Sequence, residues 1–162
     1  MRHLGLLAAL VAAFAVAGFV SVGDVVAEPA SASPREKYIL FCAGCHGFDG
    51  EGGGGGGGTE PVPPLGPDMG VFLRDQIGRA YLVNVGGVSS AGMSSAETAT
   101  VLNYILQEFG GRTLPDDFEP YTQAEVDALR KKPLDDPVTT RRDIRKALKA
   151  RGYTLPPYQW EG

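Results

Sequence analysis

The 162-residue chain contains little cysteine and little histidine, with two residues of each: Cys42, Cys45, His3 and His46. Two cysteines cannot form the disulfide network that holds together many small exported domains. A structural zinc site commonly uses four cysteine or histidine ligands, so the sequence is also a poor match to a zinc-binding domain. A small core in this chain therefore needs some other stabilising group.

Positive charge is also scarce. Lysine and arginine together number 15 against 19 acidic residues, and the formal net charge is −4. Proteins that bind nucleic acids neutralise phosphates with basic side chains, so we predict no nucleic-acid partner. The glycine-rich run over residues 50–58 ends in no Gly-Lys-Ser/Thr and follows no predicted strand, which excludes a phosphate-binding loop. We expect a flexible loop there.

The stretch Cys42-Ala43-Gly44-Cys45-His46 has the Cys-x-x-Cys-His pattern of covalent haem attachment. In such a site both thiols form thioethers with the haem vinyl groups, and the following histidine binds the iron. A thioredoxin-like dithiol would require a βαβ pattern, which is not visible here, and a plain disulfide leaves His46 without a role. We therefore predict Cys42 and Cys45 as covalent sites for one haem c and His46 as the proximal ligand.

Residues 1–33 are predicted to be an export signal, with cleavage near residue 27 or 32. The segment has an early positive charge at Arg2, a long apolar run over residues 4–22 and small residues before each cleavage point. The alternative is an uncleaved membrane anchor, since the apolar run is about long enough to span a bilayer. Both readings place the remaining chain outside the cytoplasm, and we predict a periplasmic protein.

Local signals predict helices in the following segment, over residues 34–110. Pro34 is suited to the first turn of a helix that runs into Cys42. Short helices are expected over residues 71–76 and 79–85. Ser94 and Glu97 form a capping box for a helix that ends at Gly110. We also considered Arg74 and Arg79 as partners of haem propionates, with an ordinary solvated charge as the commoner role for either.

The proline-rich segment over residues 61–65 offers backbone carbonyls close to the haem motif. One of them, from Pro63 or Pro64, could accept a hydrogen bond from the free ring N–H of His46. Such a bond fixes the orientation of a ligating imidazole and strengthens its donation to a metal. The alternative is a simple turn.

The sixth iron ligand has few candidates. After export His46 is the last remaining histidine, so two histidines of one chain cannot bind the iron together. The remaining thioethers are Met93, which lies just before a predicted helix on a small, glycine-rich loop, and Met69. Either methionine can instead simply pack in the hydrophobic core. A site without a sixth protein ligand is therefore a third possibility.

In order and spacing, the motif at residues 42–46, the proline-rich segment, Met93 and the helix over 97–109 resemble class I c-type cytochromes. The resemblance covers residues 34–110, about half of the chain. It implies an all-α cytochrome c fold whose first and last helices cross. It also implies covalent haem at Cys42 and Cys45, with His46 as the proximal and Met93 as the distal iron ligand.

Residues 111–162 form a C-terminal extension that we predict to be helical. Thr122 and Glu125 form another capping box, and Asp136 with Pro137 begins a second helix that ends at Gly152. Ile144, Ala147 and Leu148 share one face of that helix, and its other face is rich in arginine and lysine. This basic face could bind an acidic partner or a membrane, although such faces are more often simply solvated. We expect Tyr153, Tyr158 and Trp160 to pack the extension onto the haem domain.

These features together predict an exported carrier of single electrons rather than an enzyme. The resemblance suggests a periplasmic dehydrogenase as electron donor and another cytochrome or an oxidase as acceptor, with membrane contact only if the N-terminal segment stays uncleaved. Two alternatives stay open. One is a fixed haem subunit of a larger oxidoreductase, and the other is a haem sensor or enzyme with an open sixth iron position.

Overall fold

The computed structural model describes residues 32–53, 62–156 and 158. Within these ranges the regular elements are helices and none is a strand, so the described part of the chain is all-α. Chain contacts define one unit as Met1–Ala30 and a second as Ser31–Gly162, and the second holds every described residue. The predicted export signal and its cleavage sites lie almost wholly outside the described residues. No helix in the described part is long and apolar enough to cross a membrane.

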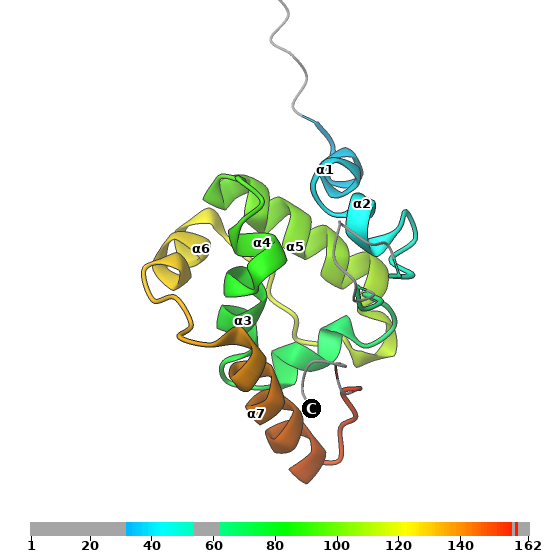
Figure 1. The fold of residues 1–162 in the computed structure, drawn as a ribbon, viewed down its shortest axis with the longest axis vertical. Helices are drawn as coiled ribbons and strands as arrows, with labels where there is room; N and C mark the ends of the chain where they lie inside the picture. Colours follow the sequence, from blue (N-terminus) through cyan, green and yellow to red (C-terminus); the bar gives the residue numbers. More distant parts are fainter. Residues whose placement is uncertain (1–31, 54–61, 157, 159–162) are drawn as a thin grey trace, which may run out of the picture. The chain divides into compact units, whose positions relative to one another are not determined.

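The helices follow the chain in the order shown in Figure 1: α1 (Pro34–Phe41), α2 (Ala43–His46), the 3-10 helix η1 (Met69–Arg74), α3 (Gly78–Asn84), α4 (Gly86–Ser89), α5 (Ser95–Phe109), the 3-10 helix η2 (Gly111–Thr113), α6 (Gln123–Arg130) and α7 (Pro137–Ala150). The predicted helices that begin at Pro34, after Ser94, after Thr122 and at Pro137 are confirmed. The helix predicted over residues 71–76 is a 3-10 helix that begins earlier, and the loop before Met93 contains the short helix α4.

Capping side chains explain where the main helices begin. Ser94 and Glu97 form the reciprocal capping box of α5, in which the Ser94 hydroxyl accepts from the Glu97 N–H and the Glu97 carboxylate accepts from the Ser94 N–H. Ser33 and Glu36 form the same arrangement at α1, a signal that our sequence analysis missed. Asp136 accepts from the N–H of Val138 at the start of α7.

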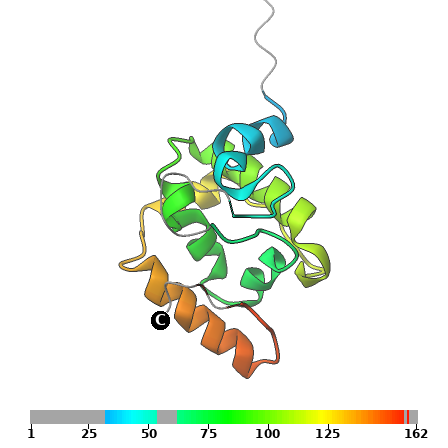
Figure 2. The ribbon, with the colours of Figure 1, turned by 45° about the vertical axis from the view of Figure 1, so that its right-hand side comes forward.

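Helix α1 packs against α5, and their axes cross in the two ribbon views (Figures 1 and 2). The fully buried ring of Tyr38 lies 5.6 Å from the ring of Tyr104 and 5.4 Å from that of Phe109, measured between centroids. At the other end of α5, Lys37 forms a 3.1 Å ion pair with Glu97. The aromatic contacts provide most of the apolar contact between the two helices. Packing of α1 on α5 places Cys42, at the end of α1, beside α5.

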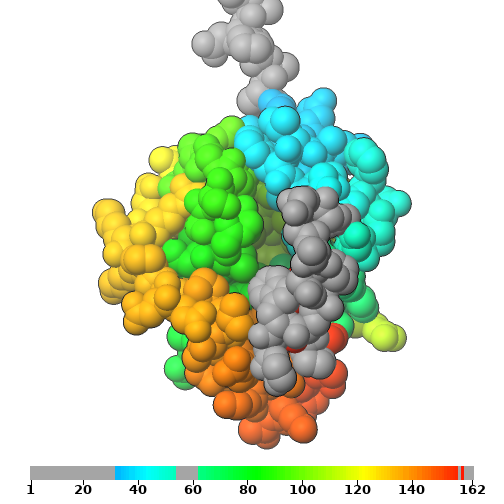
Figure 3. All heavy atoms as spheres, in the orientation of Figure 1, coloured from blue at the N-terminus to red at the C-terminus, as the bar shows by residue number. Residues whose placement is uncertain are grey.

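The C-terminal extension completes the main hydrophobic core. Its buried side chains pack in one cluster with buried side chains of η1, α3 and α5: Val71, Phe72, Tyr81, Leu82, Val83, Ala99, Leu102, Leu106, Tyr121, Val126, Ile144, Leu148 and Leu155. The space-filling view shows α6 and α7, in yellow and orange, directly against the green middle of the chain (Figure 3). The described part of the extension, over residues 111–156, is therefore part of the folded body rather than a loose appendage.

The apolar face predicted for α7 is confirmed at its centre and differs at its edge. Ile144 and Leu148 are buried, whereas Ala147 is exposed. Among the aromatic residues expected to pack the tail, Tyr158 is buried and Tyr153 is half-buried against the main core. Trp160 lies outside the described residues.

Candidate haem-attachment site

In the Cys-x-x-Cys-His motif, Cys42 lies between α1 and α2, and the four residues that follow it form α2 itself. Cys42 ends α1 with φ −125°, and its carbonyl accepts hydrogen bonds from the backbone N–H of Cys45 at 3.1 Å and of His46 at 2.9 Å. Helical spacing brings residues three and four apart onto the same face. The structure therefore places Cys42, Cys45 and His46 on one face, as the sequence analysis requires for these residues to act together.

Both cysteines are free thiols and are half-buried. Burial raises the pKa of Cys42 to about 11, and the neighbouring Cys45 adds to the shift. The nucleophilic cysteines of dithiol oxidoreductases have lowered pKa values, because the thiolate is the reactive form. A raised pKa at Cys42 therefore speaks against a thioredoxin-like dithiol.

The imidazole of His46 has a fixed partner on one side. Its Nδ1 atom lies 3.0 Å from the carbonyl oxygen of Pro63. A carbonyl can only accept, so Nδ1 carries the hydrogen and donates it, and the lone pair of Nε2 is left for a metal. Of the two carbonyls that the sequence left open, the structure selects that of Pro63.

The protonation state of His46 also suits a metal ligand. Burial lowers the pKa of His46 below its ordinary value of 6.5, and the hydrogen bond to Pro63 opposes this shift only in part. The ring is therefore neutral at physiological pH. A neutral imidazole is the form that binds metals.

The Pro63 carbonyl is held by a close approach between two chain segments. The N–H of Gly52 donates to the His46 carbonyl, and the N–H of Gly53 donates to the Val62 carbonyl, each at 2.8 Å. Gly52 has φ +73°, and a Cβ atom there would lie 2.6 Å from Val62 O and from Pro64 N. Glycine is required at this position both for the dihedral angle and for space. The rest of the predicted glycine loop, over residues 54–58, lies outside the described residues, and so does Pro61 of the proline-rich segment.

Met93 lies in the same hydrophobic cluster as the haem motif. Its side chain is 5 % exposed and packs with Tyr38, Ala43, Leu65, Val101 and Ile105, while Cys42, Met69 and Val88 border the cluster. Met93 is placed between Gly92, with φ +72°, and Ser94, the N-cap of α5. The structure thus brings both methionine candidates beside the cysteine motif, and Met93 is the more buried of the two.

The residues present fit a c-type haem. They supply two free thiols, a neutral imidazole oriented by a carbonyl, a thioether and an apolar surround. By contrast, the described residues contain no group of three or more His, Cys, Asp or Glu side chains that could hold a metal ion by itself.

The two arginines considered as propionate partners have other contacts in the structure. Arg79 forms a two-armed ion pair with Glu125 on α6, and its guanidinium stacks over the ring of Tyr121 with 3.9 Å to the centroid. Arg74 lies 5.6 Å from the ring centroid of Tyr153. Both arginines therefore contact the extension from the segment over residues 34–110.

Sequence reasoning missed one residue at this site, Arg130 at the end of α6. Its Nη1 donates to the backbone carbonyl of Met93 at 3.0 Å, and its Nη2 donates to the hydroxyl of Thr98 at 2.7 Å. No local pattern points to this contact, because the partners are separated by 37 and 32 residues in the chain.

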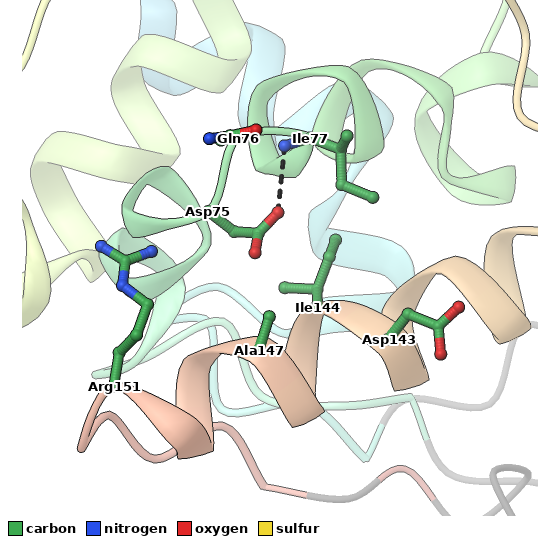
Figure 4. A pocket seen from close by; sticks show the side chains of 7 residues that line it. All are labelled: Asp75, Gln76, Ile77, Asp143, Ile144, Ala147 and Arg151. Atoms are coloured by element: carbon green, nitrogen blue, oxygen red, sulfur yellow. Dashed lines mark hydrogen bonds between the residues drawn. The ribbon is translucent and has the colours of Figure 1, made fainter.

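A depression on the surface lies apart from the predicted site residues. It lies between the turn at residues 75–77 and α7, and Figure 4 shows Asp75 and Ile77 of the turn across from Ile144 and Ala147 of α7, with Arg151 toward one end. The Asp75 carboxylate is occupied by the backbone N–H of Ile77, at 3.0 Å. No predicted haem residue lines this depression.

No known family model matches this sequence, and a search of curated proteins found no matching relative.

Proposed function

We propose that this chain is an exported monohaem c-type cytochrome with a cytochrome c-like haem domain, which carries single electrons between redox proteins. The observation that carries the proposal is the contact between His46 and Pro63. It gives the histidine of a Cys-x-x-Cys-His motif a fixed tautomer, with Nε2 free to bind iron. Few other roles require that combination beside two free thiols.

When bound, the haem would supply a reversible Fe(III)/Fe(II) couple. The chain's own residues set the conditions for it. Cys42 and Cys45 would hold the haem covalently, and His46 and Met93 would bind its iron. The thioether of Met93 would favour the reduced state and raise the reduction potential. Iron held by two side chains would be closed to substrates, which would suit a carrier rather than an enzyme.

The charge of the chain suggests how it would meet its partners. Residues 34–110 hold four basic and eight acidic side chains. An acidic surface of this kind would form weak, salt-dependent contacts with basic patches on redox proteins. We propose a periplasmic dehydrogenase as donor and a cytochrome or an oxidase as acceptor, with attachment to a membrane only if the N-terminal segment is retained.

The test is to express the full chain in a host with a periplasmic haem-attachment system. Wild type is expected to retain haem on a denaturing gel and to gain the mass of one haem. Cys42→Ser with Cys45→Ser should lose the covalent haem. Met93→Ala should keep it but lose the near-infrared band of an Fe(III)–methionine bond, whereas Met69→Ala should retain that band.

Two results would contradict the carrier. An exported chain that takes up no haem would remove the proposal altogether. A chain that holds haem covalently but lacks the methionine band, and whose reduced form readily binds CO, would have an open iron position. That result would favour a sensor or an enzyme over a carrier.

A further inference from the structure

Arg130 joins the backbone beside Met93 to the rigid start of α5. Besides the bonds to the Met93 carbonyl and the Thr98 hydroxyl, its Nη1 lies 3.4 Å from the Ser95 hydroxyl. Thr98 is fully buried and lies within α5. One guanidinium of the extension therefore bridges a loop and a helix of the haem domain.

The Met93 backbone needs such a partner. Its carbonyl precedes the N-cap Ser94, so it lies outside the hydrogen-bond ladder of α5, whose first carbonyl is that of Ser94. The preceding Gly92 adopts φ +72° and has no heavy atom within 4 Å of where a Cβ would stand. A glycine in open space resists rotation little, so the bond to Arg130 adds a polar anchor for the Met93 backbone to the packing of its side chain with Val101 and Ile105 of α5.

We infer that Arg130 is a positioning residue for Met93, through which the C-terminal extension holds the methionine sulfur at the iron. This inference rests on the proposed haem function. The planar guanidinium suits the task, because it donates to two acceptors at once in a fixed geometry. The ammonium group of a lysine is a compact point charge and cannot bridge the two acceptors in this way.

The experiment compares four holoproteins with wild type: Arg130→Gln, Arg130→Lys, Thr98→Val and the control Lys132→Gln. Lys132 is an exposed cation close to Arg130 in the chain, so its variant removes the same charge without the bridge. The first readout is the near-infrared methionine band during heating. The second is the rate at which peroxide oxidises Met93, measured by peptide mass spectrometry against Met69 in the same molecule.

In Arg130→Gln we expect the methionine band to disappear at a lower temperature than in wild type. Oxidation of Met93 relative to Met69 should rise about tenfold, the change that about 1.4 kcal/mol produces in an equilibrium between attached and detached forms. Arg130→Lys and Thr98→Val should give intermediate effects, and Lys132→Gln should match wild type. Thr98→Val keeps the shape of the side chain, so it tests the bridge even if Arg130→Gln folds poorly.

The outcomes separate this inference from the proposed function. If wild type shows the band and Arg130→Gln and Thr98→Val retain it with unchanged melting and Met93 oxidation, Arg130 does not position Met93, although the carrier stands. If Lys132→Gln shifted the melting of the band and the oxidation of Met93 as much as Arg130→Gln, the inference would also be overturned, because loss of a positive charge would then explain both effects. A wild type with haem but no methionine band would overturn both.

Discussion

The guanidinium of Arg79 on α3 donates to both carboxylate oxygens of Glu125 on α6, and each N···O distance is 2.6 Å. Its remaining nitrogen donates to the Glu119 carbonyl at 3.0 Å. The hydrogen bonds to Glu125 raise the pKa of Arg79. Two-armed pairs of this geometry are among the stronger polar contacts in proteins. This pair joins the segment predicted as haem domain to the extension.

We therefore expect Arg79→Lys to lower the free energy of unfolding by about 1–2 kcal/mol, because lysine keeps the charge and loses the two-armed contact. Urea unfolding at neutral pH would measure the change. The control is Lys146→Gln, which removes the partner of Asp143 in an exposed 3.6 Å ion pair on α7. Exposed pairs contribute little, so the control should lie within about 0.5 kcal/mol of wild type. Equal losses in the two variants would contradict the special role of Arg79.

Local sequence signals were sufficient to predict where the main helices begin. The capping box of Ser94 and Glu97 and the pair Asp136-Pro137 predicted the starts of α5 and α7 because a cap is completed within one helical turn. The existence of a carbonyl partner for His46 was predictable from the nearby prolines. The choice of Pro63 was not, because it depends on how closely Gly52 approaches the proline-rich segment.

Contacts across long stretches of chain had no such signal. Arg79 and Glu125 are 46 residues apart, and Arg130 lies 37 residues from Met93. The sequence analysis considered Arg79 only as a propionate partner or a solvated charge and did not single out Arg130, since only packing of the extension against α3 and α5 brings their partners near. The tail was expected to pack through its aromatic residues, but its larger contribution to the main core, through Val126, Ile144 and Leu148, depends on contacts that no local signal reveals.

Gly78 at the start of α3 should not tolerate a side chain. A Cβ atom there would lie 1.7 Å from the carbonyl oxygen of Phe72, a backbone atom that cannot turn aside. We expect Gly78→Ala to destabilise the fold by at least about 2 kcal/mol, within the range for overpacked interiors. The matched control is Gly86→Ala at the start of α4, where a Cβ would have no neighbour within 4 Å. Thermal unfolding should show a large drop for the first variant and little or none for the second.

Glu97 should make stability depend on pH in the acid range. Its bonds to Ser94, first to the backbone and then to the hydroxyl, lower the pKa of Glu97 from 4.5 to about 2, and Lys37 adds to the shift. Between these values the unfolded chain binds more protons than the folded chain, so stability falls as the pH falls from about 4.5 to about 2. The stabilisation is fully present above that window.

Glu97→Gln tests this, because the amide can still accept from Ser94 but cannot titrate. At neutral pH the variant should be less stable than wild type. This difference in the free energy of unfolding should decrease as the pH falls from about 4.5 to about 2. Urea midpoints from neutrality to about pH 2.5 would measure it. Glu108→Gln, an exposed carboxylate near the other end of α5, is the control for loss of charge alone. A gap between wild type and Glu97→Gln that stays constant with pH would contradict the argument.

Gly52 offers a way to displace the Pro63 carbonyl, which no side-chain substitution at Pro63 can remove. A Cβ at Gly52 would lie 2.7 Å from the Pro63 carbonyl carbon, so Gly52→Ala should push the proline-rich segment away from His46. Gly53 is the matched control: its φ of +79° carries the same backbone strain as the +73° of Gly52, but a Cβ there meets nothing within 4 Å. The difference between the two variants therefore isolates the close approach.

In the proposed haem-loaded form, a weaker bond to Pro63 would make the imidazole of His46 a poorer electron donor, which would disfavour Fe(III). The reduction potential should therefore rise in Gly52→Ala by more than in Gly53→Ala. The ring N–H of His46 should also exchange faster with solvent, as followed by proton NMR, because its acceptor has moved. If both variants shift the reduction potential equally, backbone strain alone explains the shift, and the Pro63 carbonyl does not influence the potential. If only Gly52→Ala shifts it, the contact that orients His46 also sets its strength as a ligand.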